Sequence, residues 1–483
     1  MSYQKKYLFL LLVLGSLMSC NKAMMSKKST PPPNVVLIFI DDLGWKDLGF
    51  MGSDYYETPN LDAFVKQGMV FNKAYASAAN CAPSRACMLS GQQSPRHGVY
   101  TVNSSARGKA KTRRIIPTKN TIHLEDDLFT LPDLFKSAGY VTGSFGKWHV
   151  GNDPIKQGID VNVAGCEKGN PGKGGYFSPY KVANIENGPD GEYLTDRLTD
   201  EAIQFVKDNQ EKPFFLYLPY YTVHTPIMAK EELLQKFENK KGSKEHSNAA
   251  YAAMIYSMDQ NVGRLLKHLA DLQLDKNTLV LFTSDNGGIR SISRQTPLRA
   301  GKGSYYEGGI RVPMAVRWPG KIKAGTSCDT RVTNLDFYPT FQKIIKAQPV
   351  PFPLDGTDLS PLFYGKQIAE RDLVWHFPIY LQAYKPKFDD ARDPLFRTRP
   401  GTILISDNWK LHEYFEDQAL ELYDLSTDLG ERNNLVNSQP EKAKILHEKM
   451  KKWRSQMDAP VPTELNPKYD AEFEQRLILE VGK

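Results

Sequence analysis

The chain has 483 residues, of which 41% are hydrophobic and 11% aromatic. This is enough apolar material for a large buried core, and the length predicts two domains. The 62 basic and 55 acidic residues give a formal net charge of +7, and the excess is spread along the chain instead of forming a tail. Such a charge is weak evidence for an anionic partner, and it predicts no nucleic-acid partner.

The first residues are typical of an export signal. Two lysines precede an apolar run over residues 7–14, which is too short to span a bilayer as a helix. Cys20 follows Leu-Met-Ser, which resembles a bacterial lipoprotein cleavage box. We therefore expect a signal peptide over residues 1–20, a lipid anchor to the membrane on Cys20, and a tether over residues 21–33. Cleavage without lipidation is the alternative. The expected location is periplasmic or cell-surface, in a Gram-negative bacterium.

Short apolar runs then alternate with helical stretches. The runs cover residues 35–40, 140–142, 214–218 and 278–282. The helical stretches include residues 61–67, 193–209 and 248–272. Continuous apolar strands are typical of a sheet buried on both faces, so the alternation predicts an α/β fold. We expect a large mixed, mostly parallel sheet sandwiched by helices.

Residues 81–91, Cys-Ala-Pro-Ser-Arg-Ala-Cys-Met-Leu-Ser-Gly, predict a nucleophile at the start of a helix. Pro83 fits a first helical turn, and Gly91 fits its end. Cys81 is expected just before this helix, where backbone N–H groups and the helix dipole favour an anion. Arg85 lies four residues on, on the same face. A buried cysteine in an ordinary helix is the alternative.

The five cysteines are Cys20, Cys81, Cys87, Cys166 and Cys328. With the first two set aside for lipid and chemistry, at most one disulfide can form. Stability must therefore come from the hydrophobic core.

Polar residues follow each of the four predicted strands. They are Asp41, Asp42, Lys147, His149, His224, Asp285 and Asn286. Open α/β sheets place their ligand crevice beyond the carboxyl ends of the strands, so we expect these side chains at one rim. Singly, each has a structural explanation such as a cap, a turn or a packed histidine. Their joint occurrence favours a site.

The chemistry of these residues indicates a metal ion and an anion. Asp41, Asp42, Asp285 and Asn286 offer oxygen ligands, which suit Ca²⁺ or Mg²⁺ and argue against zinc. The expected donors and cations around a small tetrahedral anion are Arg85, Lys147, His149, His224 and Lys302. A metal ion with several cations suits a displacement reaction at sulfate or phosphate.

The most basic run, Arg-Gly-Lys-Ala-Lys-Thr-Arg-Arg at residues 107–114, is predicted to be a loop. A solvated loop is one interpretation of this run. A contact for an acidic polymer is the other.

With these motifs, the chain resembles the type I, formylglycine-dependent sulfatases of the alkaline phosphatase superfamily, which include arylsulfatases and bacterial carbohydrate sulfatases. The resemblance runs from about residue 34 to about residue 435, and Cys81-Ala-Pro-Ser-Arg85 fits the signature C-x-P-x-R. It implies that a formylglycine-generating maturation enzyme oxidises Cys81 to formylglycine (3-oxoalanine), whose aldehyde hydrates to a diol. It also implies a site that usually holds Ca²⁺, with Mg²⁺ as the other option. Its implied ligands are Asp41, Asp42, Cys81, Asp285 and Asn286.

The resemblance further implies a mechanism. One hydroxyl of the diol attacks sulfur to form a covalent sulfate ester on residue 81, while His224 protonates the departing alcohol oxygen. The second hydroxyl then expels sulfate and regenerates the aldehyde, with assistance from His149. An unmodified thiol has no second hydroxyl and could not release sulfate in this way.

The remaining catalytic roles concern the sulfate group. By resemblance, Lys147 and Lys302 hold sulfate oxygens, and Arg85 steadies the formylglycine side. Arg294 and Arg299 lie close to Lys302 in the sequence and are alternatives for its role or weaker candidates for substrate binding.

The chain beyond residue 365 resembles the smaller C-terminal subdomain of these enzymes. Three antiparallel strands and an amphipathic helix are predicted at residues 397–408, 410–414, 421–425 and 442–457. We therefore expect a catalytic domain over residues 34–365 and a subdomain over residues 366–483. His376 near its start and His97 after the predicted helix are candidate substrate contacts, with a packed histidine as the alternative for both.

Together these features predict hydrolysis of a sulfate ester, with a sulfated glycan expected ahead of a small aryl sulfate. Specificity is expected from the C-terminal subdomain and from loops such as residues 106–119 and 165–180. Two other functions stay open. One is a phosphodiesterase or phosphonate hydrolase of the same superfamily, and the other is a glycan-binding lipoprotein whose sulfatase site is never matured.

Overall fold

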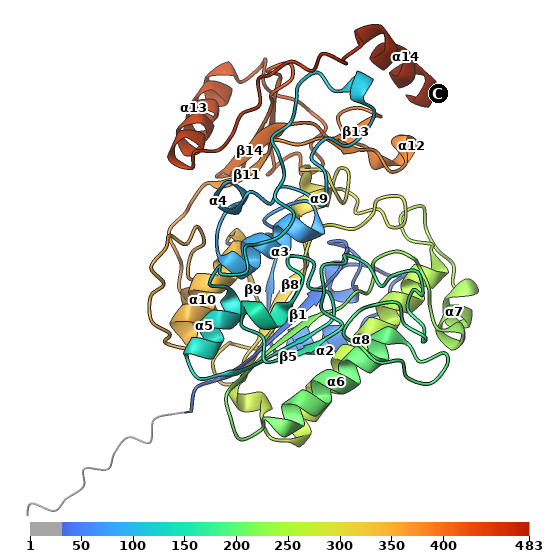
Figure 1. Ribbon diagram of the computed structural model, residues 1–483, viewed down its shortest axis with the longest axis vertical. Coiled ribbons are helices and arrows are strands. Elements are labelled where there is room, and N and C mark those ends of the chain that lie inside the picture. Colours follow the sequence, from blue (N-terminus) through green and yellow to red (C-terminus); the bar gives the residue numbers. More distant parts are fainter. Residues whose placement is uncertain (1–30, 483) are drawn as a thin grey trace, which may run out of the picture. The chain divides into compact units, whose positions relative to one another are not determined.

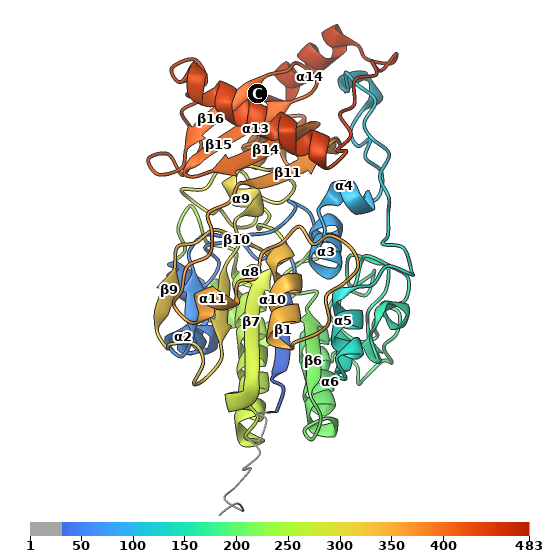
Figure 2. The same ribbon diagram turned by 90° about the vertical axis from the view of Figure 1, so that its left-hand side faces the viewer.

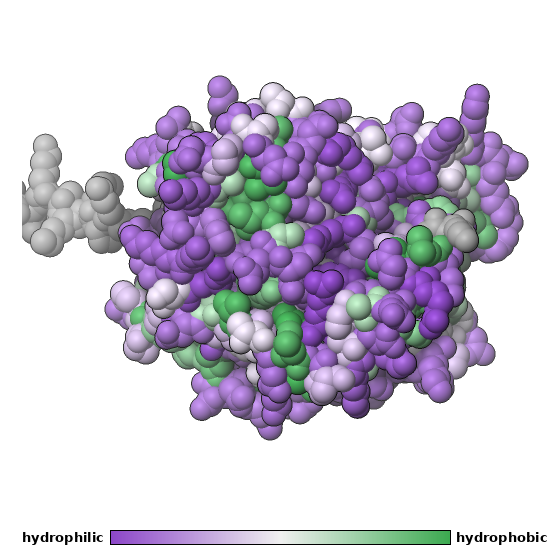
Figure 3. Space-filling model, turned by 90° about the horizontal axis from the view of Figure 1, so that it is seen from above, coloured by the Kyte–Doolittle hydropathy of each residue, from purple (hydrophilic) through white to green (hydrophobic). Residues whose placement is uncertain are grey.

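The computed structural model describes residues 31–482. The predicted signal peptide, the lipidation site at Cys20 and most of the predicted tether lie outside the described residues. Within residues 31–482, no helix combines the length and the apolar composition that crossing a membrane requires. The face seen in Figure 3 is mostly hydrophilic, and its apolar residues lie in small separate groups.

An eight-stranded sheet forms the centre of the fold (Figures 1 and 2). In spatial order its strands are β5 (Val161–Val163), β4 (Val141–Phe145), β6 (Phe214–Pro219), β1 (Asn34–Ile40), β7 (Thr278–Ser284), β8 (Met314–Arg317), β2 (Met69–Phe71) and β9 (Thr326–Cys328). All neighbours pair in parallel except β8, which is antiparallel to β7 and to β2. The sheet is therefore mixed and mostly parallel, which confirms the predicted fold class.

Helices cover both faces of this sheet, as Figure 1 shows. One face carries α2 (Pro59–Lys66), α6 (Leu194–Asp208) and α8 (Ala249–Asp271), and the other carries α3 (Cys81–Ser90), α5 (Leu131–Ser137) and α10 (Phe337–Ile344). Strand β1 is buried along its whole length, with Val36 and Ile38 in the first core and Val35 and Leu37 in the second. Alternate side chains of a strand point to opposite faces, so a continuous apolar run fills both cores.

A second sheet with four antiparallel strands lies in the C-terminal part of the chain. Its order is β11 (Leu373–Phe377), β14 (Gly401–Ser406), β15 (Trp409–Tyr414) and β16 (Leu420–Asp424). Helix α13 (Pro440–Gln456) lies across one face of it, as seen in Figure 2. On that face Val374 and Leu411 pack with Leu446 of α13. On the other face, Trp375 packs with Tyr75 of β3 (Ala74–Tyr75).

The remaining helices and strands are short, except at the C-terminal end. They are β3 (Ala74–Tyr75), α4 (Ser94–His97), α7 (Glu231–Glu238), α9 (Glu307–Ile310), β10 (Val332–Thr333), α11 (Ser360–Phe363), β12 (Leu381–Gln382), α12 (Pro386–Asp389), β13 (Phe396–Thr398) and α14 (Ala471–Gly482). The single strand predicted over residues 397–408 is two strands, because Arg399 and Pro400 separate β13 from β14. Proline lacks the N–H that a continuous ladder needs.

The cysteines of the described chain are all free thiols. They are Cys81, Cys87, Cys166 and Cys328. The one disulfide that the sequence allowed is therefore not formed among them, and the two buried cores carry the stability of the fold.

Candidate active site

Cys81 is the first residue of α3, one position further into the helix than predicted. Asn80 precedes it in an extended conformation, Pro83 lies in the first turn, and Gly91 ends the helix with a φ of 67° in the left-handed region that favours glycine. Cys81 and Arg85 are both buried, Arg85 completely. The helix start therefore presents Cys81 from a fixed, fully packed segment.

The ends of three neighbouring strands meet below Cys81. Asp41 and Asp42 follow β1 directly, and Asp285 follows β7, whose last residue pairs with the last residue of β1. The Asp41 N–H donates to the Thr222 carbonyl beyond β6 at 3.1 Å, and the Asp42 N–H donates to Asp285 Oδ1 at 3.2 Å. Asp42 has a φ of 60°, a left-handed conformation that is rare for residues other than glycine and clusters at functional sites.

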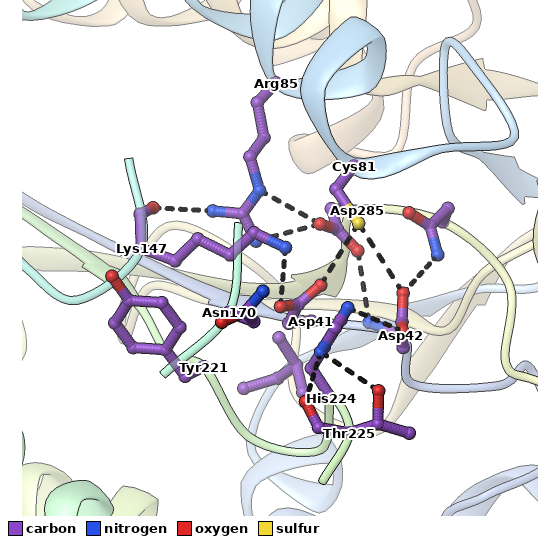
Figure 4. A network of polar contacts seen from close by, with 12 residues as sticks. Asp41, Asp42, Cys81, Arg85, Lys147, Asn170, Tyr221, His224, Thr225 and Asp285 are labelled. Carbon is purple, nitrogen blue, oxygen red and sulfur yellow. Dashed lines mark hydrogen bonds and ion pairs between the residues drawn. The ribbon is translucent and has the colours of Figure 1, made fainter. Parts of the chain in front are cut away.

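The thiol of Cys81 points at both carboxylates that follow β1 (Figure 4). Its Sγ lies 3.5 Å from Asp41 Oδ1 and 3.7 Å from Asp42 Oδ1. Burial raises the pKa of this thiol well above its usual value, although Lys147 and Lys302 oppose the shift. Because only the thiolate is a good nucleophile, the unmodified cysteine is poorly reactive at neutral pH.

Three buried cations pair with the three aspartates. Lys147 Nζ lies 2.7 Å from Asp41 Oδ2, and Lys302 Nζ lies 2.7 Å from Asp42 Oδ2. Arg85 contacts Asp285 Oδ2 through Nε at 2.9 Å and Nη2 at 2.8 Å, and it donates to the Lys147 carbonyl at 2.8 Å. Each carboxylate therefore has one cation in direct contact. We call Asp41, Asp42, Cys81, Arg85, Lys147, His224, Asp285, Asn286 and Lys302 the catalytic cluster.

The electrostatic balance differs between the two adjacent aspartates. Burial raises the pKa of Asp41 to about 7 despite the opposing charge of Lys147. Burial acts in the same direction on Asp42, but Lys302, His224 and Lys147 together hold its pKa below the usual range. A further positive charge beside Asp41 would favour its ionised form.

Two histidines approach the cluster. His224 Nδ1 donates to the Thr225 carbonyl at 2.6 Å, which leaves Nε2 facing Asp42 Oδ2 at 3.7 Å (Figure 4). His149 lines the same pocket as Cys81 and His224, has a φ of 70°, and has a buried Nδ1 without a hydrogen-bond partner. Gly169 lies against its ring so closely that a Cβ would come within 2.3 Å of Cε1. Burial lowers the pKa of both imidazoles, that of His224 to about 3.

The donors beside Cys81 fit a divalent cation. Asp41, Asp42, Cys81 and His224 each offer a ligand atom, and these atoms lie within 4.8 Å of one another. The amide oxygen of Asn286 is buried without a hydrogen-bond partner, while its Nδ2 donates to Asp42 Oδ1 at 2.8 Å. A carboxylate-rich set with an unpaired amide oxygen suits a hard cation such as Ca²⁺ or Mg²⁺. Of the predicted ligands, Asp285 is paired with Arg85, as Asp41 is with Lys147 and Asp42 with Lys302.

A pocket of about 450 Å³ opens onto Cys81. The lining residues are Asn80, Cys81, Val102, Asn103, Arg107, His149, Glu167, Lys168, Gly169, Asn170, His224, Lys302, Leu381, Tyr384 and Arg397. Three members of the catalytic cluster, Cys81, His224 and Lys302, thus lie at the wall of a cavity large enough for a small-molecule group.

The structure places His376 and His97 away from this pocket. Strand alternation sends His376 to the α13 face of its sheet, where Nδ1 accepts from the Thr402 hydroxyl and Nε2 donates to the Pro460 carbonyl. His97 is half-buried behind α3, with Nε2 3.5 Å from Cys87 Sγ. Both are packed histidines, the alternative that the sequence left open.

Arg294 and Arg299 do not line the pocket either, whereas Lys302 does. Arg299 lies 3.8 Å above the Tyr306 ring and donates to the carbonyls of Asp390, Ala391 and Glu431. Its guanidinium is therefore used within the fold. The backbone of Arg294 is hydrogen-bonded to Glu245 and His246.

Sequence reasoning did not single out Arg397 and Tyr384, and it left the basic loop open. Arg107 of that loop lines the pocket, while Lys109 and Lys111 lie over the Phe473 ring of α14. The loop thus combines a pocket contact with a packing contact. Nothing in the local pattern around residue 397 distinguishes its arginine from any other strand residue.

Comparisons with known proteins agree with this architecture. The sulfatase family model matches residues 33–346, and a second model, for the C-terminal part of N-sulphoglucosamine sulphohydrolase, matches residues 301–458. A sulfatase of Formosa agariphila is 33% identical, covering 95% of this chain and 94% of that protein. The N-acetylgalactosamine-6-sulfatase of Canis lupus familiaris is 33% identical, covering 74% of this chain and 72% of its own length.

A solved structure extends the likeness to the whole fold. The crystal structure of Ps i-CgsB in complex with k-i-k-neocarrahexaose has a TM-score of 0.72 at 30% identity, covering 93% of this chain and 98% of that one. A mixed α/β sheet whose strand ends surround a cysteine, aspartates and lysines defines a hydrolase with an anion-binding centre. The chain belongs to the sulfatase family and is a sulfuric ester hydrolase.

Proposed function

We propose that this sulfatase removes sulfate from a sulfated glycan, using a formylglycine derived from Cys81 and a bound divalent cation. The observation that carries the proposal is the position of Cys81, whose Sγ lies within 3.7 Å of both Asp41 and Asp42 at the wall of the pocket. It is the first residue of the C-x-P-x-R signature. The contacts of the neighbouring residues support their assigned roles.

Conversion of Cys81 agrees with the chemistry of its surroundings. The raised pKa of the thiol makes it a weak nucleophile, so the site gains little from a cysteine as such. As formylglycine, residue 81 would supply a hydrated aldehyde with two hydroxyls. One would attack sulfur, and the second, on losing its proton, would expel sulfate and regenerate the aldehyde. Asp41, Asp42, residue 81, Asp285 and Asn286 would hold a divalent cation, which would supply positive charge beside the reacting oxygens.

His224 is proposed to protonate the leaving alcohol oxygen. The Thr225 carbonyl fixes the tautomer, with the proton on Nδ1, so Nε2 is free to carry the proton that is transferred. In the substrate-free site burial holds the pKa of His224 near 3, and a sulfate ester anion beside Nε2 favours the imidazolium form. His149 is proposed to assist the release step, because it lines the same pocket with an unpaired Nδ1.

Lys147 and Lys302 are proposed to hold sulfate oxygens. Both ammonium groups are buried and each is bound to one aspartate. A divalent cation bound by these aspartates would neutralise their negative charge, so the N–H groups of the two lysines would become available to bind sulfate oxygens. Arg85 stays on Asp285 and the Lys147 carbonyl, which positions Lys147 next to residue 81.

The proposal of a glycan substrate is supported by the pocket and by relatives. The neighbouring structure Ps i-CgsB was solved with a carrageenan oligosaccharide, and the named animal relatives are N-acetylgalactosamine-6-sulfatases. We further propose export as a lipoprotein through Cys20, maturation by a formylglycine-generating enzyme, a catalytic domain over residues 34–365 and a subdomain over residues 366–483.

The sharpest test compares ester classes with the matured protein. Sulfated oligosaccharides, an aryl sulfate and a phosphate diester are assayed side by side, with metal content measured and the peptide containing residue 81 weighed by mass spectrometry. We expect an aldehyde mass at residue 81 and turnover of a sulfated oligosaccharide. A much faster phosphate diester reaction would favour the phosphodiesterase alternative, and a thiol in protein from the native host would favour the binding lipoprotein.

A further inference from the structure

Two arginines of the active-site pocket have no carboxylate partner in the described part of the chain. Arg107 donates through Nε to Gln382 Oε1 at 3.0 Å and through Nη1 to the Val102 carbonyl at 3.4 Å. Arg397 donates through Nε to the Gln382 carbonyl at 3.1 Å and through Nη1 to the Lys302 carbonyl at 2.9 Å. Both guanidinium groups therefore bracket Gln382 of β12 and are held by neutral acceptors.

Neighbouring arginines in the same region are paired with acids. Arg399, two residues after Arg397, contacts Asp393, Glu416 and Glu474. The chain thus places several carboxylates in this region. Asp389 acts on Arg397 electrostatically, but no carboxylate forms an ion pair with Arg397 among the described residues. A buried cation without an anion in direct contact is unfavourable unless a ligand provides one.

Arg397 is also the more deeply placed of the two. Only 5% of its surface is exposed, and its guanidinium lies 3.3 Å from the centre of the Tyr384 ring. Burial lowers its pKa and the charge of Arg107 adds to that effect, while Tyr384 and Asp389 oppose it. Tyr384 and Gln382 hold the two arginines side by side despite their repulsion.

The outer part of the pocket is positively charged as a whole. Lys168, on the loop after β5, is exposed and forms no hydrogen bond or ion pair within the described residues. Glu167 is the one acidic residue among those lining the pocket, and it is exposed to solvent. An incoming sulfate ester at Cys81 satisfies the catalytic cluster but leaves these outer cations available.

We propose that Arg107 and Arg397 form a second anion subsite, which binds another anionic group of the same substrate, a sulfate ester or a carboxylate. This inference rests on the proposed glycan substrate and narrows it to glycans that carry two negative groups close together. Guanidinium groups bind both kinds of oxyanion through paired N–H donors, and Tyr384 fixes the plane of one of them. Arg397 also links this subsite to the catalytic cluster through the Lys302 carbonyl.

The test is the preference of the enzyme for doubly over singly charged substrates. Matched oligosaccharides are used that carry the cleaved sulfate alone, with a second sulfate, or with a carboxylate in place of that second sulfate. For Arg107→Gln, we expect the ratio of kcat/KM, doubly charged over singly charged, to fall about tenfold to a hundredfold. The loss should appear mainly in KM, and the two doubly charged forms show which anion the subsite takes.

Lys109→Gln is the matched control, because it removes one positive charge from the same loop outside the pocket. This variant should keep the ratio of the unmodified sequence. The proposal is overturned if Arg107→Gln keeps the ratio, or if Lys109→Gln lowers it equally, since the effect would then be one of general charge. Arg397→Lys serves as a second variant that keeps the charge but loses the planar group.

A binding measurement separates this inference from the proposed function. Calorimetry with the Cys81→Ser protein gives affinities for the same oligosaccharides without turnover. A higher affinity for the doubly charged forms, lost in Arg107→Gln, supports the subsite even if no sulfate is released. Turnover of sulfated oligosaccharides with equal affinities for singly and doubly charged forms would keep the proposed function and refute the subsite.

Discussion

Two of the buried clusters of opposite charges in residues 31–482 differ in what they leave unpaired. One is the catalytic cluster. In the other, Lys410 of β15 lies 2.9 Å from Glu307 of α9 and 2.9 Å from Glu431, and His412 lies 3.1 Å from Glu431. We call these four residues the β15–α9 cluster. Lys410, Glu307 and Glu431 are as fully buried as Asp41 and Lys147. Burial and charge therefore do not distinguish the two clusters.

Hydrogen bonding does distinguish them. None of the buried side-chain nitrogens and oxygens of the β15–α9 cluster lacks a partner. In contrast, Asn286 Oδ1 of the catalytic cluster and Nδ1 of His149, which lines the same pocket as Cys81, have none. The β15–α9 cluster is also absent from the residues that line the pocket. Unsatisfied buried polar atoms in or next to a pocket are typical of a ligand-binding site, and fully paired ones are typical of a structural cluster.

The β15–α9 cluster also supports the candidate active site. Its ion pair to Glu307 fixes α9 in place. The carbonyl of Gly309, also in α9, accepts from the Gly287 N–H at 3.0 Å. Gly287 lies so close to α9 that a Cβ there would meet the Gly308 carbonyl oxygen at 2.0 Å. The loop that carries Asp285 and Asn286 is thereby pressed against a helix that the C-terminal sheet holds in place.

The largest expected difference between the clusters comes from Cys81→Ala. Removing the source of the nucleophile should lower kcat by at least about 10⁴-fold, while the free energy of unfolding changes by about 1 kcal/mol. Cys87→Ala, on the same buried helix, is the matched control and should keep its turnover. Steady-state kinetics and denaturant unfolding check both, and near-normal turnover of Cys81→Ala would refute its role.

His224→Ala should lower kcat by about 10²-fold to 10⁴-fold, because the leaving alcohol then departs without a proton. The loss should shrink for aryl sulfates whose phenol is acidic, since these leave readily as anions. His447→Gln, a partly exposed histidine paired with Glu413 on the far side of the small sheet, is the control. An equal loss for acidic and weakly acidic leaving groups would assign His224 a role other than proton transfer.

In the β15–α9 cluster, Lys410→Met should lower the free energy of unfolding by about 3–5 kcal/mol, because two buried glutamates lose their cation. Lys449→Met removes an exposed pair with Asp372 and should change stability by about 0.5 kcal/mol or less. Denaturant titration compares the two. A stability change in Lys410→Met no greater than in the control would show that the β15–α9 cluster does not hold the C-terminal sheet to α9.

Metal removal should destabilise the catalytic cluster and leave the β15–α9 cluster unaffected. A cation at about 100 times its dissociation constant stabilises the folded state by about 2.7 kcal/mol. We expect chelation to lower the melting temperature and Ca²⁺ to restore it, and Asp42→Asn should abolish that dependence. Melting curves with Ca²⁺ and Mg²⁺ in parallel also identify the preferred ion, and metal-independent melting would contradict the proposed site.

The sequence predicted most of the fold and the centre of the site, for one physical reason. Residues such as Asp42 and Asn286 directly follow continuous apolar strands, and parallel pairing of β1 with β7 fixes where their side chains meet. Arg397 and Tyr384 were not predicted, because their position depends on how β12, β13 and the segment between them pack beside the pocket. For His376 the sequence left a substrate contact and a packed histidine open, since a one-residue change in strand parity decides which face a side chain takes.

The smallest expected effect tests whether His376 belongs with the structural residues. Burial lowers its pKa to about 3, and in the unfolded chain a histidine titrates near 6.5. Above pH 6.5 both states hold the neutral ring and the stabilising contribution is complete. As pH falls below 6.5, only the unfolded chain gains the proton, so the free energy of unfolding falls by about 1.4 kcal/mol per pH unit until the folded pKa is reached.

His376→Gln should therefore reduce the loss of stability between pH 7.5 and pH 5 by about 2 kcal/mol. His447→Gln is the control, because that ring is partly exposed and paired with an acid. Denaturant titrations at the two pH values give the four differences needed. The neutral ring accounts for both hydrogen bonds, because Nδ1 accepts from Thr402 while Nε2 donates to the Pro460 carbonyl. An unchanged pH dependence in His376→Gln would contradict this assignment and would mean that the ring is protonated or reaches solvent in the folded state.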